Sequence, residues 1–343
     1  MASYCGKKVD VTVVALTLVA LNNISYMLAA RKASTGGLAE VAMKARHNMW
    51  MAEYGRTYKN EAEKAQRFKV FKANADFIDK FNAAGNRKYF LATNEFADMS
   101  NEEFMAMYAR YKPMPSRAKI LSGFKYPNVT LADIPKEVDW TKKGAVTKIK
   151  HQNQCGCCWA FSAVATVESI HQIKTGQLLS LSEQQLLDCI RDDHDCTGGF
   201  MDVPLKYIVD NGGIATENDY PYTAARGKCN HNVKLTVKIT GFEIVPKNNE
   251  EALAAAVAKQ PVAVNLDSRK FQHYGGGVML GHDCGTTLTH SLAVVGYGLE
   301  GETKYWLLKN QWGEHWGENG YLRLERGTNA CGITEEEACY PVA

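Results

Sequence analysis

The sequence predicts an α+β protein in which a helical half precedes a sheet half, with a cleft between the two. Three observations support this prediction. Apolar residues recur at helical spacing between residues 158 and 174. After Gly241 the chain changes to short β-rich segments that are separated by glycines. All cysteines except Cys5 follow Asp133, which indicates a domain boundary there.

Residues 1–30 have the pattern of a secretory signal peptide. Lys7 and Lys8 precede a short apolar run, residues 11–21, and small residues follow, the last at Ala30. We therefore expect cleavage near Ala30, the alternative being a soluble core helix or strand. No apolar stretch reaches the roughly 20 residues of a membrane-spanning helix, so no membrane span is predicted.

The composition excludes several classes of protein. The chain has 343 residues, of which 45% are hydrophobic and 22% charged, so it can bury a core and is not disordered throughout. A net charge of +3 is far from that of a nucleic-acid binder. Ten cysteines are many for a cytosolic protein, and they favour disulfides in an oxidising compartment.

The N-terminal part differs from the rest in pattern and charge. Residues 31–104 have a mostly helical pattern, and residues 112–133, with three prolines, are typical of a linker or extended strip. Residues 1–133 carry 20 Lys and Arg against 12 Asp and Glu, a net +8, whereas residues 134–343 carry 20 against 25, a net −5. Opposite charges suggest that the two parts attract one another.

In the C-terminal part, the expected elements follow in order. The helix over residues 158–174 should end at Gly176, and a second helix is expected over 182–189. Short strands are then expected over residues 261–266, 291–297, 305–309 and 321–325. A cleft between such halves is a common place for a functional site.

The densest chemical signal is the run of residues 152–162, in which Cys158 opens the first of these helices. The helix N-terminus favours the thiolate, the reactive form of cysteine. A thiolate nucleophile also needs a base, usually histidine, and a group that orients this base. His290 and Asn310 follow Cys158 by 132 and 152 positions.

These residues resemble those of the papain family of cysteine proteases. The family has a Cys-Gly-Ser/Ala-Cys-Trp/Tyr run with His and Asn about 130 to 150 residues downstream. Residues 155–159 read Cys-Gly-Cys-Cys-Trp, and the runs over 294–298 and 312–321 match as well. The sequence around Cys158 is similar to that of plant senescence-associated members of the family.

The front part resembles the propeptide of the cathepsin L-like branch. Its interspersed motif matches at six positions on one helix stripe: Glu63, Arg67, Phe71, Asn74, Ile78 and Asn82. The alternative is an ordinary amphipathic helix. The resemblance implies an inhibitory helical propeptide over 31–133. It also implies a two-lobed peptidase over 134–343, with a helical lobe, an antiparallel β-barrel-like lobe and a cleft between them.

The resemblance also implies the roles of the catalytic residues. Cys158 would be the nucleophile, His290 the base and acid, and Asn310 the group that orients the imidazole, with Trp312 shielding their hydrogen bond. Gln152 and the Cys158 backbone N–H would form the oxyanion hole. No metal or cofactor is implied.

Six cysteines match the disulfides of the family, namely Cys155–Cys196, Cys189–Cys229 and Cys284–Cys331. Cys157, which stands where Ser or Ala is usual, and Cys339 remain unassigned. Cys339 is expected to be a buried free thiol, and a bridge between these two is the alternative.

The pocket for the second residue before the scissile bond is implied by position. Its residues would be Gly198, Gly199, Met201, Leu288 and Thr289 near Trp312, with Glu336 at the far end. Glu336 would accept arginine, or else it is a solvated surface charge. Asn128 starts a glycosylation sequon, and it lies in the propeptide.

The predicted function is that of a cysteine endopeptidase that is made as a zymogen. Expected partners are protein and peptide substrates, the chain's own propeptide and cystatin-type inhibitors; we expect a monomer, in a vacuole, a lysosome-like compartment or outside the cell. The alternatives are an inactive protease homologue, a thiol–disulfide oxidoreductase that uses the Cys155–Cys158 pair, and a metal-binding module.

Overall fold

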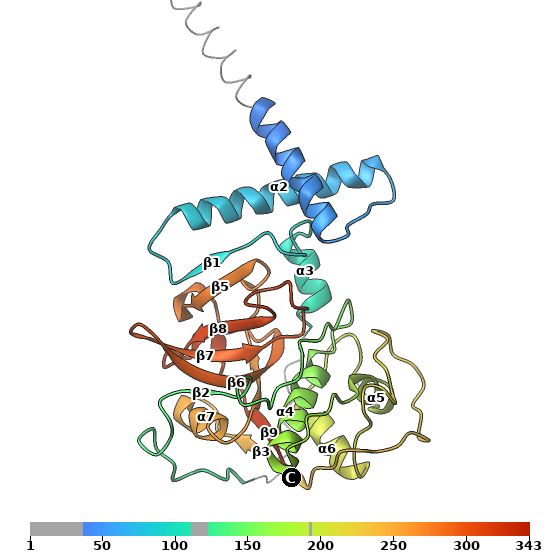
Figure 1. Cartoon of the computed structure of the whole chain (residues 1–343), viewed down its shortest axis with the longest axis vertical. Coiled ribbons are helices and arrows are strands. Elements are labelled where there is room, and N and C mark those ends of the chain that lie inside the picture. Colours follow the sequence, from blue (N-terminus) through green and yellow to red (C-terminus); the bar gives the residue numbers. More distant parts are fainter. Residues whose placement is uncertain (1–36, 111–122, 192–193) are drawn as a thin grey trace, which may run out of the picture. The chain divides into compact units, whose positions relative to one another are not determined.

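The computed structural model of the chain describes residues 37–110, 123–191 and 194–343 (Figure 1). The predicted signal peptide, residues 1–30, lies outside the described residues. The chain forms two compact units that are divided after Lys72. Among the described residues, no helix is both long enough and apolar enough to cross a membrane.

In the first unit, an aromatic cluster joins two helices. Residues 37–53 are helical, and α2 (Glu61–Ala83) begins after a short connection. The fully buried Phe71 ring lies 4.9 Å from the His47 ring and 5.1 Å from the Trp50 ring, between centroids. Aromatic pairs at such distances stabilise a core beyond the area that they bury. The phenylalanine of the predicted propeptide motif therefore fixes one helix to the other.

The asparagines of the same motif bind backbone in the second unit. The Asn74 side-chain amide donates to Ala97 O at 2.8 Å and to Met99 O at 2.9 Å. The Asn82 side chain donates to Leu91 O and accepts from Leu91 N. An amide can satisfy a backbone N–H and a C=O at once. Asparagine is therefore required at these two positions of the motif, where α2 binds the backbone of the segment that follows it.

That chain leads to a short strand and a short helix. β1 (Tyr89–Leu91) precedes α3 (Asn101–Tyr108). Ser100 caps α3 by accepting from the Glu103 N–H, while the Glu103 carboxylate accepts from the Ser100 N–H. This reciprocal cap satisfies two backbone donors at the helix start.

Helices form one lobe of the remaining chain, as the sequence predicts. α4 (Cys158–Thr175) ends at Gly176, whose φ of 77° is left-handed and suits glycine. α5 (Glu183–Cys189) starts at Ser182, whose side chain accepts from a backbone N–H. A third helix, α6 (Asp202–Asp210), was not predicted, because it is short and contains a proline. The helix forms nevertheless, since the proline lies in its first turn, where proline is tolerated.

Strands form the other lobe. Figure 1 shows α4, α5 and α6 gathered on one side of this unit and the strands on the other. The elements of the lobe are β2 (Val138–Asp139), β3 (Gly241–Val245), α7 (Glu250–Val257), β4 (Val262–Leu266), β5 (Tyr274–Met279), β6 (His290–Glu300), β7 (Thr303–Lys309), β8 (Tyr321–Glu325), β9 (Ala338–Val342) and single 3-10 turns at Gly281–Asp283 and Ala330–Gly332.

The strand order is β1-β5-β8-β7-β6-β4-β9-β3, with β2 paired to β6. The described pairs are antiparallel except for β5 with β8, which are parallel. β1 comes from the predicted propeptide, so this segment adds a strand to one edge of the sheet. The α+β prediction with two lobes is confirmed.

Three disulfides are formed, Cys155–Cys196, Cys189–Cys229 and Cys284–Cys331, which are the pairs that the resemblance implies. Cys157, Cys158 and Cys339 are buried thiols outside any disulfide. Cys339 lies on β9, opposite Ile244 and Ala263. The alternative bridge between Cys157 and Cys339 is therefore not formed.

Candidate active site

Cys158 lies where the sequence predicts, at the first position of α4. The preceding residue, Cys157, gives this helix no side-chain cap. Burial raises the pKa of the fully buried Cys158 thiol, although the backbone and hydroxyl of Ser291 act to lower it. Cys158 therefore lies next to the start of β6 in surroundings that favour its protonated thiol.

His290 is the first residue of β6 and is fully buried. Its Nε2–H donates to Asn310 Oδ1 at 3.0 Å, and its Nδ1 has no hydrogen-bond partner among the described residues. The bond to Asn310 selects the tautomer in which Nδ1 carries the free lone pair. Burial lowers the pKa of His290 to about 4, against the opposing effect of Asn310. The imidazole is thus a neutral base.

Trp312 covers this pair. Its ring stacks on the His290 ring with centroids 4.6 Å apart and an angle of 28° between planes. Trp312 is fully buried, so it excludes water from the bond between His290 and Asn310. Gln311 replaces the serine that is usual in the family, and its amide donates to Ser291 O at 2.9 Å. This hydrogen bond links β6 to the segment that follows β7.

Gln152 lies at the same end of the cleft. Its backbone N–H donates to Gln311 O, and its side-chain amide donates to Cys155 O, both at 2.9 Å. An amide nitrogen has two hydrogens, so one N–H remains for a ligand. Asn153, which stands where the family has glycine, adopts a φ of 52°. Asparagine tolerates this left-handed conformation better than most residues.

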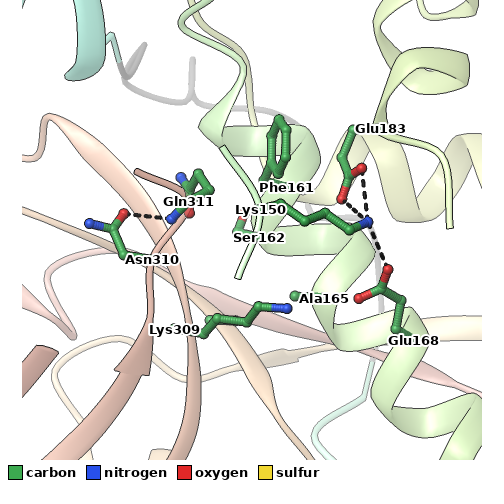
Figure 2. A pocket seen from close by; sticks show the side chains of 10 residues that line it. Lys150, Phe161, Ser162, Ala165, Glu168, Glu183, Lys309, Asn310 and Gln311 are labelled. Atoms are coloured by element: carbon green, nitrogen blue, oxygen red, sulfur yellow. Dashed lines mark hydrogen bonds and ion pairs between the residues drawn. The ribbon is translucent and has the colours of Figure 1, made fainter. Parts of the chain in front are cut away.

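A polar cavity lies beside these residues, between the two lobes (Figure 2). Lys150 crosses it, with its Nζ 2.9 Å from a Glu168 oxygen and 2.7 Å from a Glu183 oxygen. Burial would lower the pKa of Lys150, but the two carboxylates outweigh burial and raise it. Burial also raises the pKa of Glu183 to about 7, in spite of Lys150. Pairing with the two carboxylates therefore keeps Lys150 charged in spite of its burial.

The cluster joins the two lobes next to Asn310. Lys309 Nζ donates to Thr147 Oγ1 at 2.7 Å, and this hydroxyl donates to Glu168 at 2.6 Å. Burial lowers the pKa of Lys309 to about 8, although Glu168 raises it. Because Lys309 precedes Asn310, the bond to Thr147 fixes the backbone that carries the orienting amide. No sequence pattern reveals this network, because its members are up to 162 positions apart.

The predicted pocket residues are in varied environments. Met201 is buried, and Leu288 is half-buried. Gly199 lies against the Trp159 ring, and a Cβ at this position would lie 2.8 Å from it. Gly198 has a φ of 123°, which glycine adopts readily. The Thr289 hydroxyl is already bonded to Ser268.

Glu336 is linked to the vicinity of Cys158 by Asn265, which was not among the predicted site residues. Asn265 Nδ2 donates to Glu336 Oε2 at 3.3 Å, and Asn265 Oδ1 accepts from Ser291 Oγ at 2.7 Å. The signal was available, because Asn265 is the single polar residue of the buried strand β4. Ser291 in turn contacts Cys158.

The predicted propeptide covers this site. Phe96, Phe104 and Tyr108 pack edge-on against Trp312, with centroids 6.1, 5.0 and 6.3 Å away. The Arg110 side chain lies on Gly156, and its guanidinium reaches Cys196 O at 3.4 Å. This segment therefore contacts residues on both sides of the site, Trp312 on one side and Gly156 with Cys196 on the other.

Polar contacts add to this docking. Arg87 lies 4.0 Å from Asp283, as the net charges of the two parts predict. The carboxylate of Glu95 lies 3.1 Å from His151 Nε2, within hydrogen-bond distance.

Comparison with known proteins decides the family. The model of the papain family cysteine proteases matches residues 134–342. The chain belongs to this family. The cathepsin propeptide inhibitor domain matches residues 47–104. This papain-family protein is therefore a cysteine protease that is made as a proenzyme with an inhibitory propeptide. The membership decides against an oxidoreductase or a metal-binding module.

Named relatives extend over nearly the whole papain-family chain. It is 51% identical to the senescence-specific cysteine protease SAG39 of Oryza sativa subsp. japonica, over 93% of this chain and 95% of the relative. It is 45% identical to SAG12 of Arabidopsis thaliana, over 88% and 91%. Among solved structures, recombinant stem bromelain precursor matches with a TM-score of 0.82 and 42% identity, over 88% and 99%.

Proposed function

We propose that Cys158, His290, Asn310 and Gln152 carry out peptide hydrolysis in this endopeptidase. The observation that supports this most is the state of His290, whose Nε2 is bound to Asn310 while its Nδ1 lone pair is unused. In the proposed reaction, His290 Nδ1 takes the proton of the Cys158 thiol, and the thiolate attacks the peptide carbonyl. His290 then protonates the leaving amine, and water hydrolyses the acyl-enzyme.

The tetrahedral intermediate carries a negative oxygen that needs donors. The remaining N–H of Gln152 and the backbone N–H of Cys158 would bind it. A donor of this kind contributes about 3–4 kcal/mol to the lowering of the barrier. The free end of an 18-residue helix adds a favourable dipole at the same place.

Removal of the propeptide would activate the two titrating groups. In the proenzyme, burial raises the pKa of Cys158 and lowers the pKa of His290, and both shifts favour neutral forms. Water that enters the cleft after removal would stabilise the thiolate and the imidazolium. We infer that the propeptide inhibits by exclusion of water as well as by occupation of the cleft.

The proposed specificity pocket combines apolar walls with a carboxylate. Gly198, Gly199, Met201, Leu288 and Thr289 would form the walls, near Trp312. Glu336, held by Asn265, would accept arginine at the second position before the scissile bond, because a guanidinium binds a carboxylate through charge-assisted bonds.

Processing and location follow the same proposal. A signal peptide would be removed near Ala30 and the propeptide near Asp133. The disulfides and the propeptide are consistent with the secretory pathway. We propose a monomer that acts in a vacuole, a lysosome-like compartment or outside the cell and that cystatin-type inhibitors bind. Asn128 is exposed, as a glycosylated residue must be.

The test compares histidine and cysteine variants of the full chain. Cys158→Ser and His290→Ala should fold but lose both peptide hydrolysis and labelling by a peptidyl epoxide. His315→Ala, which alters an exposed histidine five residues after Asn310, should keep both. Full hydrolysis by Cys158→Ser would overturn the assignment. Loss of hydrolysis in the unaltered chain after propeptide removal would favour the alternative, an inactive homologue.

A further inference from the structure

One tyrosine hydroxyl contacts both segments that supply the proposed oxyanion donors. Tyr222, between α6 and β3, donates its hydroxyl hydrogen to Gln152 O at 2.7 Å. The same oxygen lies 3.0 Å from Cys157 Sγ. Gln152 supplies one proposed donor from its side chain, and Cys157 immediately precedes the Cys158 N–H, which is the other.

The direction of these hydrogen bonds is fixed by the number of hydrogens. A carbonyl cannot donate, so the single phenol hydrogen must point to Gln152 O. The Cys157 thiol must then donate its own hydrogen to the Tyr222 oxygen. Burial raises the pKa of both groups far above neutrality, so neither group ionises. The result is a chain with one orientation, from Cys157 through Tyr222 to Gln152.

Tyr222 is itself held on two sides. Its backbone N–H donates to Glu217 Oε1 at 2.8 Å. Its ring packs edge-on against Phe161 of α4, with centroids 5.0 Å apart. Phe161 lies on the first turn of the helix that begins with Cys158, so the hydroxyl is fixed relative to the nucleophile as well as to Gln152.

We propose that Tyr222 is a positioning residue of the oxyanion hole, which sets the Gln152 side chain and the Cys158 N–H at a constant separation. The proposal rests on the proposed function, since it needs these two donors to act on the intermediate. Loss of an oxyanion donor lowers kcat by about 10²–10³, and a donor that is only displaced should cost less. Tyr222 would then contribute to kcat without touching the substrate.

The experiment separates the oxyanion from the thiolate. A peptide aldehyde adds to the Cys158 thiol and forms a tetrahedral hemithioacetal, whose oxygen lies where the intermediate's oxygen would lie. A peptidyl epoxide alkylates the same thiol by ring opening and forms no such oxygen at a former carbonyl. Aldehyde affinity therefore reports on the oxyanion hole, and the alkylation rate reports on the nucleophile.

The variant is Tyr222→Phe in the full chain, measured after propeptide removal. We expect kcat and aldehyde affinity each to fall about tenfold, with KM and the alkylation rate within about twofold. The matched control is Tyr220→Phe, because the Tyr220 hydroxyl bonds to Asp188 and Lys228 O instead. This control should leave all four quantities within about twofold. Cys157→Ser, which keeps a donor towards Tyr222, should retain most of kcat.

Two results would overturn the proposal. One is unchanged kcat and aldehyde affinity in Tyr222→Phe. The other is an equal fall in aldehyde affinity and alkylation rate, which would show general damage to the fold. If phenylalanine at 222 prevents folding, Cys157→Ala tests the other end of the chain of hydrogen bonds. It removes the bond to Tyr222 but keeps the bond from Tyr222 to Gln152 O, so aldehyde affinity should fall by less than about tenfold while the alkylation rate stays within about twofold. Failure of the proposed function appears separately, as hydrolysis that survives Cys158→Ser.

Discussion

Phe104 of the propeptide packs edge-on against Trp312, with ring centroids 5.0 Å apart. The Trp312 ring also stacks on the His290 ring, with centroids 4.6 Å apart. One indole therefore separates the inhibitory segment from the proposed catalytic base. The propeptide is anchored on the ring that shields the base, next to the cleft that it closes.

Truncation of this anchor should speed activation. Phe104 is fully buried, and a buried Phe→Ala change costs about 3–5 kcal/mol. Phe104→Ala should therefore convert to the mature form faster, and at higher pH, than the unaltered proenzyme. Electrophoresis of samples taken over time at pH 5 to 7 measures this. Phe77→Ala, whose ring is 54% exposed, is the control and should convert at the normal rate. Equal rates for the two variants would contradict the prediction.

Acid should weaken propeptide docking through His273. His273 O accepts from the Ala92 N–H of the propeptide, and burial lowers the pKa of its imidazole to about 4. Its Nδ1 has no partner among the described residues. The same pocket is lined by three cations, Arg87, Arg269 and Lys270, and by one carboxylate, Asp283, which pairs with Arg87. A proton on this ring therefore gains no hydrogen bond within the described residues, and the charged groups that line the pocket are net positive.

The direction of this pH effect follows from the pKa of His273 in the docked form and the ordinary pKa of histidine. The ordinary histidine pKa is about 6.5, so the undocked or unfolded chain binds the proton more readily than the docked form. Stability of the docked form is then lost as the pH falls from about 6.5 to about 4, by at most about 3 kcal/mol. His273→Gln should flatten the acid dependence of activation. His282→Gln, at an exposed histidine, should not. Identical pH profiles for His273→Gln and the unaltered chain would exclude this role.

Local pattern predicts only part of this fold. α4 has helical periodicity and a glycine stop, so its bounds are right within one residue. α7 was not predicted. It has six buried residues in a row, four alanines with Leu253 and Val257. A helix that is buried on all sides has no polar face, so its sequence shows no helical periodicity. β5 contains three glycines that are typical of a loop. Gly277 is required there, because a Cβ would lie 2.3 Å from Lys88 O of the propeptide.

The residues of the site also fall into two groups, those that a sequence pattern reveals and those that it does not. Cys158, His290 and Asn310 can be found because their types and spacing match a family pattern. Asn265 and Tyr222 belong to no such pattern. Tyr222 reaches Gln152 across 70 positions, and only tertiary packing brings their atoms together. Residues that position others are therefore found from contacts rather than from sequence.

The carboxylate of Glu336 should select substrates. Asn265 holds it by a bond of 3.3 Å, which orients it for a guanidinium. Glu336→Ala should lower kcat/KM for an Arg-Arg fluorogenic peptide about tenfold and leave a Phe-Arg peptide within about twofold. Glu335→Ala is the control, because the exposed Glu335 bonds to Asn329 instead. Equal losses on both peptides, or no cleavage of Arg-Arg at any pH from 4 to 7, would make Glu336 an ordinary surface residue.

Among the residues between the two lobes, we expect substitution of Lys150 to lower the stability of the protein most. It is the cation that contacts both Glu168 and Glu183, and both carboxylates are almost fully buried. Its removal leaves two buried carboxylates close together, and loss of one member of a buried ion pair costs about 3–5 kcal/mol. For a peptidase of this size, Lys150→Met should lower Tm by about 10 °C in differential scanning calorimetry at pH 7. Lys174→Met, in the last turn of α4, is the matched control and should change Tm little. Acid neutralises the buried carboxylates that the change leaves without their cation, and the pKa of Glu183 is already about 7 in the unaltered chain. The difference between Lys150→Met and the unaltered chain should therefore shrink as the pH falls below about 7. A difference that is constant with pH would show that the lysine acts through packing of its side chain and not through its charge.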